Sequence, residues 1–113
     1  MMFRRLSKHK VLHFKPDGFW CGEAPEQPIR WADVVEIVAF KEDLLTVDDI
    51  RLGFRLSGQS DYFVISEDVN GFDDLLRTLP AHFPGIRTDW FSDVAFPPFA
   101  ENWTVIWTKH SVG

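Results

Sequence analysis

Residues 31–56 read WADVVEIVAFKEDLLTVDDIRLGFRL, and this stretch decides the fold. In residues 50–56, apolar side chains alternate with arginine or glycine, which is the two-residue period of a strand with one dry and one wet face. Residues 34–40 have both strand and helix spacing, but their β-branched side chains favour a strand, with one helical turn before it at residues 31–33. We therefore predict a central β-hairpin with a polar turn at residues 41–49.

Shorter strand patterns flank this hairpin. Residues 11–22 predict a first hairpin, because the turn sequence Pro-Asp-Gly separates two short apolar segments. Residues 62–66 predict a further strand with Phe63 and Ile65 facing inward, and residues 102–109 alternate in the same way. Both segments are therefore expected to be strands.

After residue 70 the period changes from that of a strand to that of a helix. Asn70 is placed to cap the helix, Pro80 is expected to disturb its last turn, and residues 84–85, Pro-Gly, end it. Four residues at helical spacing form one apolar stripe: Phe72, Leu75, Leu76 and Leu79. This stripe needs an apolar surface, which residues 50–56 supply.

These elements predict a single α+β domain. We expect a bent antiparallel sheet of about five to seven strands, packed by one main amphipathic helix. Residues 1–9 form a basic arm, and residues 10–113 form the domain. Within it, residues 10–83 hold the sheet and helix, and residues 84–113 form an aromatic-rich C-terminal extension.

The charge is distributed unevenly along the 113 residues, whose net charge is −5. Residues 1–15 hold five basic and no acidic residues, whereas residues 16–113 hold seven basic and seventeen acidic residues, giving +5 and −10. An acidic body repels phosphate backbones, so we do not expect nucleic-acid binding. It favours a protein partner with a basic surface.

The single cysteine, Cys21, cannot form an internal disulfide, which is typical of a reducing compartment. The N-terminal residues lack the apolar run of a signal peptide, and no stretch has the roughly 20 apolar residues of a membrane span. We predict a cytoplasmic protein.

The sequence holds few candidates for site chemistry. His9 and His13 have a metal-ligand spacing only on a helix, and the pattern around them is that of a strand. The adjacent acids Asp48-Asp49 and Asp73-Asp74 point in different directions within a strand or helix. The glycines form no phosphate-binding loop. We therefore predict neither a metal nor a cofactor.

Cys21 and His13 are the one candidate pair for nucleophilic catalysis, because the first hairpin could bring them together. Neither an orienting third group nor an oxyanion arrangement is visible in the sequence. A structural cysteine is the simpler interpretation, since cysteine is commonly buried.

The aromatic extension is the most distinctive feature. One interpretation is a lid packed over the sheet, and the other is a partly exposed interface anchored by Trp and Phe. Pairing of residues 103–107 with a second copy would give a homodimer. The candidate interface residues come from the extension and from the acidic turn: Trp90, Phe91, Phe99, Trp103, Trp107, Glu42, Asp43, Asp48 and Asp49.

Three short motifs carry a family resemblance: Asp17-Gly18-Phe19, Ile29-x-Trp31-x-Asp33-Val34-x-x-Ile37 and Gly71-Phe72-x-x-Leu75-Leu76. They resemble small bacterial domains of the pleckstrin-homology/GRAM type, and small bacterial proteins that include immunity proteins of contact-dependent toxin systems. The resemblance covers residues 10–83 and implies a bent antiparallel roll closed at one corner by a helix. The loops at residues 23–27 and 41–49 are mostly acidic, whereas lipid-binding relatives use basic loops, so phosphoinositide binding is not expected.

Three functional hypotheses follow. The leading one is a non-enzymatic binding module for a basic protein partner, of which an immunity-type protein is one form. The second is a small enzyme with a site near His13 and Cys21. The third is weak membrane association, which is disfavoured because the basic arm holds few apolar anchors; its charged residues are Arg4, Arg5, Lys8 and Lys10.

Overall fold

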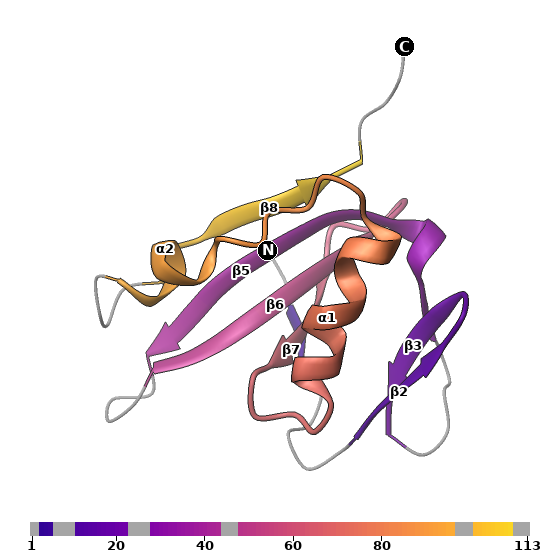
Figure 1. Ribbon diagram of the computed structural model, residues 1–113, viewed down its shortest axis with the longest axis horizontal. Helices are drawn as coiled ribbons and strands as arrows, with labels where there is room; N and C mark the ends of the chain where they lie inside the picture. Colours follow the sequence, from indigo (N-terminus) through magenta and orange to yellow (C-terminus); the bar gives the residue numbers. More distant parts are fainter. Residues whose placement is uncertain (1–2, 6–10, 23–27, 44–47, 97–100, 110–113) are drawn as a thin grey trace.

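The central hairpin is present and is longer than predicted. The computed structural model describes residues 3–5, 11–22, 28–43, 48–96 and 101–109. Strands β5 (Val34–Asp43) and β6 (Asp48–Leu56) form the longest antiparallel ladder of the sheet, in which Ile37 lies opposite Phe54 (Figure 1).

The predicted polar turn at residues 41–49 is wrong at both ends. Pairing continues through Lys41 opposite Ile50 to Asp43 opposite Asp48. Lys41 and Asp49 are buried, with 3% and 5% of their surface exposed. Polarity alone indicated a turn, but both charged side chains find partners inside the protein, so the strands can continue through them. The predicted helical turn is confirmed as the 3-10 helix η1 (Trp31–Asp33).

A five-stranded sheet is built around this hairpin, in the order β1-β7-β6-β5-β8. The added strands are β1 (Phe3–Arg5), β7 (Tyr62–Ser66) and β8 (Thr104–Thr108). Strands β7, β6, β5 and β8 are antiparallel, which confirms the strands expected at residues 62–66 and 102–109. β1 pairs with β7 in parallel, so part of the predicted basic arm is a strand.

A second, three-stranded sheet has the order β2-β3-β4 and confirms the first hairpin. It consists of β2 (Leu12–Lys15), β3 (Gly18–Cys21) and β4 (Ile29–Arg30). Gly18 is required here, because a Cβ at this position would lie 2.1 Å from the carbonyl oxygen of Ile29. The α+β class is thus confirmed, with eight strands among the described residues.

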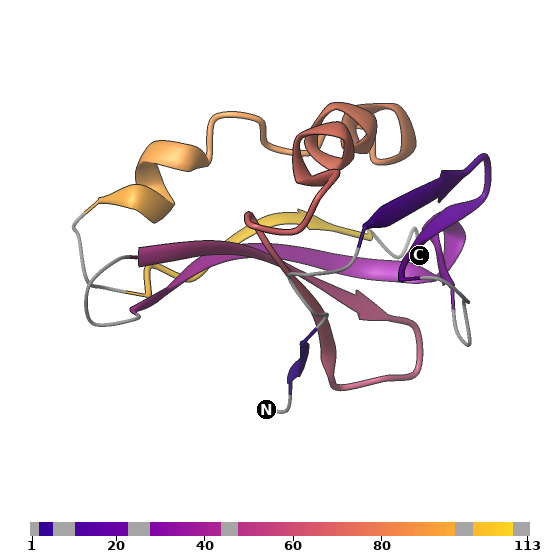
Figure 2. The same cartoon turned by 90° about the horizontal axis from the view of Figure 1, so that it is seen from below.

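Both helices lie on the same face of the large sheet, as the edge-on view in Figure 2 shows. They are α1 (Phe72–His82) and the short α2 (Phe91–Ala95), which packs near β5. α1 buries its predicted stripe, with Leu76 only partly covered. Pro80 lies inside α1, and the helix continues for two further residues to His82, so the proline does not end it.

The predicted N-cap of α1 is wrong. Gly71 occupies the cap position with φ 98°, and no side chain caps the helix. A positive φ suits glycine, which explains why this residue ends the preceding turn. Asn70 acts through its main chain instead, since its carbonyl oxygen accepts a hydrogen bond of 2.9 Å from the Leu12 amide.

The two faces of the large sheet both carry apolar clusters. The main core lies under the helices and includes Leu52 and Phe54, as predicted for residues 50–56. The opposite face is not simply wet, because a smaller buried cluster lies on it: Val38, Phe40, Tyr62 and Val64, with Trp103 packed against them.

Replacing Phe54 by alanine tests this account of the core. The side chain is fully buried and its ring contacts that of Phe19 edge to face, with 5.3 Å between centroids. Phe54→Ala is expected to lower the free energy of unfolding by about 3–5 kcal/mol in urea denaturation. The matched control Phe96→Ala removes a ring that is 68% exposed, and is expected to cost less than about 0.5 kcal/mol. Equal losses would contradict the placement of the core.

Candidate protein-binding site

Helix α2 presents aromatic rings to solvent. Trp90, at its N-cap, and Val94 are buried in the main core and hold the helix against the sheet. Phe91 and Phe96 are 56% and 68% exposed, although both are large apolar residues. Exposed rings in one short segment are typical of a contact surface rather than of a core.

A pocket of about 180 Å³ lies beside Phe91, between α1 and the segment that leads into α2. Cofactor and drug-like sites occupy about 300–1,000 Å³, so a pocket of this size suits a single apolar side chain better. We call Phe91, Phe96 and this pocket the α2 surface. The apolar lining of the pocket includes Leu76, Leu79, Pro80, Ile86 and Trp90.

Arg87 also lines the pocket, and its charge is balanced by two carboxylates. Its Nε lies 3.2 Å from Asp89, and its Nη2 lies 2.6 Å from Asp93. Hydrogen bonds to Asp93 and Asp89 raise the pKa of Arg87, so the guanidinium stays charged. Neither acid lines the pocket itself, but the cluster of Arg87, Asp89 and Asp93 beside it carries a net charge of −1.

The end of α2 is fixed by two side-chain donors from elsewhere in the chain. The Nζ of Lys41 donates to the carbonyl oxygen of Ala95 at 2.8 Å, and the Nδ2 of Asn102 donates to that of Val94 at 2.9 Å. The last carbonyls of a helix have no partner within the helix, and a cation there also complements the helix dipole. Lys41 belongs to β5, so the central hairpin itself positions the α2 surface.

The main chain strengthens this attachment. The amide of Lys41 donates to the carbonyl oxygen of Glu101 at 2.8 Å, and Arg87 N donates to Ile106 O at 3.0 Å. Asn102 has a φ of 51°, a left-handed conformation that asparagine tolerates better than most residues. The segments on both sides of α2 are therefore joined to β5 and β8.

The aromatic residues predicted as an interface differ in how exposed they are. Phe91 is exposed, as the prediction requires, but Trp90 is buried. Trp103 stacks on Phe40 with 5.1 Å between ring centroids, and Trp107 packs edge to face on Phe83. These three indoles act as core or lid residues in this structure. Phe99 lies outside the described residues.

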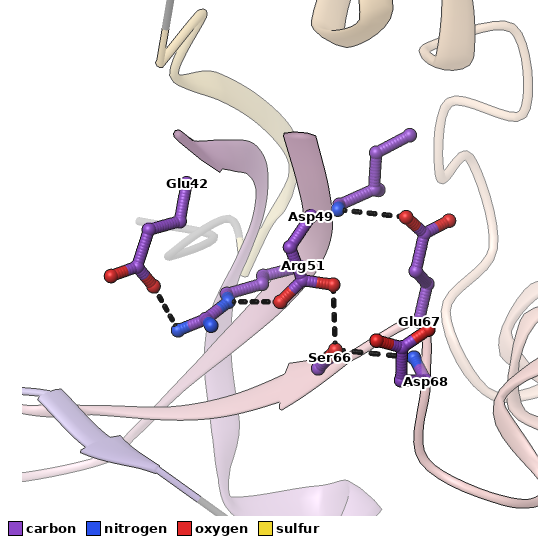
Figure 3. A network of polar contacts seen from close by, with 7 residues as sticks. Glu42, Asp49, Arg51, Ser66, Glu67 and Asp68 are labelled. Atoms are coloured by element: carbon purple, nitrogen blue, oxygen red, sulfur yellow. Dashed lines mark hydrogen bonds and ion pairs between the residues drawn. The ribbon is translucent and has the colours of Figure 1, made fainter. Parts of the chain in front are cut away.

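The predicted acidic interface on the central hairpin is not a free surface. Figure 3 shows the guanidinium of Arg51 between the carboxylates of Glu42 and Asp49. Asp49 is buried and also accepts a hydrogen bond of 2.7 Å from the Ser66 hydroxyl. Asp49 therefore has a structural role, while the predicted contact with a partner stays a prediction. Asp43 and Asp48 lie in the ladder, and their side chains are outside the described part of the structure.

The same network includes a carboxylate with a shifted pKa. Partial desolvation of its carboxyl group, followed by the nearby charges of Asp49 and Asp68, raises the pKa of Glu67, although the residue as a whole is exposed, while its hydrogen bond with the Ile50 amide lowers it. That bond is 3.1 Å long, from Ile50 N to Glu67 Oε1, and the amide of Glu67 in turn donates to Ile50 O. Glu67 thus connects the end of β7 to β6.

The candidate catalytic pair does not converge. In the first hairpin, Cys21 lies opposite Leu12, whereas His13 lies opposite Trp20 and stacks on it with 5.1 Å between ring centroids. Adjacent positions of a strand point to opposite faces, so the thiol and the imidazole lie on different sides of the sheet. Cys21 packs against the main core and His13 is exposed.

The other candidate chemistry gives no site among the residues that the structure describes. His9, Lys8 and Lys10 lie outside the described residues, so the histidine pair and most of the basic arm are not described. Within the described ranges, no three His, Cys, Asp or Glu side chains are grouped closely enough to hold a metal ion. Among those residues, no helix combines the length and apolarity needed to cross a membrane.

Sequence reasoning missed Phe96, Arg87 and the pocket beside α1. The pocket depends on how the segment that leads into α2 packs on α1, which no local pattern reports. A usable signal was the spacing of Arg87 with Asp89 and Asp93, since closely spaced opposite charges predict a local ion-pair cluster.

No protein-family model, curated protein or solved structure matches this chain.

Replacing Lys41 tests its role in fixing α2. Lys41→Met keeps most of the apolar stem but removes the donor to Ala95, so α2 should loosen while the β5–β6 ladder persists. The amides of Val94 and Phe96, which donate to Trp90 O and Ser92 O, are expected to exchange with solvent at least tenfold faster.

In the same hydrogen-exchange experiment, Lys109→Met is the control, because Lys109 is exposed. Unchanged exchange in α2 of the Lys41→Met variant would show that the lysine does not hold the helix.

Because the pKa of Glu67 is raised, Glu67→Gln is expected to increase the free energy of unfolding by an amount that depends on pH. The glutamine keeps the acceptor oxygen for the Ile50 amide. A glutamate whose pKa is higher in the folded than in the unfolded state stabilises the fold at pH values below its unfolded-state pKa. This stabilisation is lost as the pH rises through the folded-state pKa. Glu67→Gln should therefore be more stable than the wild type near pH 7, by less than about 1 kcal/mol because the group is solvent-screened.

Urea denaturation of both proteins near pH 7 and near pH 3 checks this, with Asp17→Asn as an exposed-acid control. A gain that is equal at both pH values would contradict the assigned cause.

Proposed function

We propose that this chain is a non-enzymatic binding module that contacts a basic protein partner through its α2 surface. The observation that carries this proposal is the exposure of two rings in a segment that Lys41 and Asn102 attach to the sheet: Phe91, which lines an apolar pocket, and Phe96, five residues further on. A contact surface that is already ordered loses little entropy on binding.

The dimensions of the α2 surface favour a protein partner over a small ligand. Its pocket has room for about one side chain, and the ring of Phe91 at the pocket is exposed rather than enclosed in a cavity. One inserted anchor surrounded by further aromatic contacts is the usual anatomy of a protein hot spot.

Charge supports a basic partner. The net charge is −5, and the two acids that pair with Arg87 beside the pocket, Asp89 and Asp93, outnumber this base. Complementary charge raises the rate of encounter and selects against acidic partners. An immunity-type protein that blocks a basic toxin is one form of this function. For the fold, we propose a pleckstrin-homology-like roll, which the antiparallel sheet and helix α1 support.

Selection of a displayed random-peptide library on the folded protein tests the proposal. We expect enrichment of peptides whose affinity falls tenfold or more, about 1.4 kcal/mol, in the variant Phe91→Ala/Phe96→Ala. Both rings are exposed, so this variant should keep the wild-type melting temperature.

The matched control is Phe14→Ala, which removes an exposed ring from the other sheet and should leave affinity unchanged. The proposal is contradicted if no peptide is enriched, or if the enriched peptides bind Phe91→Ala/Phe96→Ala as tightly as the wild type.

A further inference from the structure

A polar depression adjoins the start of α1, at the opposite end of this helix from the apolar pocket. Its volume is about 490 Å³, and its lining runs from Glu67 to Arg77. Four carboxylates and one guanidinium line it, and we call this set the α1 acidic patch: Glu67, Asp68, Asp73, Asp74 and Arg77.

The acidic patch keeps an excess of negative charge. Arg77 forms an ion pair with Asp74, so the single base in the patch is already compensated by one acid. Asp68, Asp73 and Asp74 are exposed, and Glu67 is exposed although it bonds to the Ile50 amide. The burial cost of a cationic partner group here is therefore low, because the patch itself is accessible to solvent.

Helix α1 connects the acidic patch to the apolar pocket. Asp73 lines the patch and Leu76 lines the pocket, and residues three apart are neighbours on a helix surface. Further along, Pro80 also lines the pocket. At 1.5 Å per residue, Asp73 and Pro80 lie about 10 Å apart along the helix axis.

This arrangement sets the spacing that a ligand would need. An extended peptide advances about 3.3 Å per residue, so about three residues span the distance from the pocket to the patch. A partner segment with an apolar anchor and a basic residue about three positions away would fill the pocket and meet the carboxylates at once.

We propose, on the basis of the function proposed above, that the ligand is a bipartite segment: one aromatic or large aliphatic side chain in the pocket, and Lys or Arg about three residues away on the α1 acidic patch. Two weak contacts joined by a short linker bind together more tightly than either alone. The patch therefore selects among partners, whereas the pocket anchors them.

The composition of the library-selected peptides tests this inference. We expect Lys or Arg to be enriched two to four positions from the aromatic or aliphatic anchor. Replacing those basic residues by Glu in the best peptide should weaken binding tenfold or more at low salt, and raising the salt concentration should reduce this difference.

Matched protein variants locate the effect. Asp68→Asn/Asp73→Asn should reduce the preference for the basic over the Glu-substituted peptide at least threefold, whereas Asp17→Asn, an exposed acid on the first hairpin, should leave it unchanged.

Two failures are distinguishable. Peptides that need Phe91 and Phe96 but show no charge preference, or a preference unaffected by Asp68→Asn/Asp73→Asn, would overturn the bipartite ligand and leave the binding function standing. Absence of any binding that depends on Phe91 and Phe96 would overturn both.

Discussion

The burial of Lys41 is the interaction on which the candidate site depends. An ammonium group inside a protein is costly unless it has hydrogen-bond partners. Here the Nζ of Lys41 finds one at Ala95, the last residue of α2, while the backbone of Lys41 remains in the β5–β6 ladder. The hairpin can therefore continue through a charged residue, and the same contact holds a five-residue helix that is too short to be stable alone.

On the opposite face of the hairpin, a buried charge is stabilised by neighbouring side chains rather than by a helix carbonyl. Asp49 is buried, and its two carboxylate oxygens are used by Arg51 and Ser66. Removing one partner from such a cluster leaves a buried charge without compensation, so these residues are expected to hold structure rather than to meet a partner. Acidic residues that contact a basic partner must instead lie on the exposed side of the molecule, as Asp73 and Asp93 do.

Much of the fold could be predicted from local patterns, because period and turn chemistry report directly on it. The alternation in residues 50–56, the Pro-Asp-Gly turn and the helical stripe beginning at Phe72 each predicted the right element. Asn70 was a plausible cap by residue type, but the left-handed geometry of Gly71 took that role. Predictions failed where a charged residue was buried, since polarity by itself does not reveal a tertiary partner.

The candidate site was only partly predictable for the same reason. The aromatic composition predicted an interface in the C-terminal extension that includes Phe91. It could not distinguish buried indoles such as Trp90 from exposed rings such as Phe96. That distinction depends on which side of α2 meets the sheet. The pocket itself is lined by α1, by the segment that leads into α2 and by Phe91, and its existence follows from how that segment packs on α1.

The most direct measurement of the central claim is an NMR titration of the labelled protein with the best library-selected peptide. The account predicts that shift changes cluster at Leu76, Ile86, Phe91 and Phe96, with smaller changes at Asp73. Changes confined to the β2-β3-β4 sheet, or to the face of the large sheet that carries Val38 and Val64, with the signals of α2 unmoved, would contradict it.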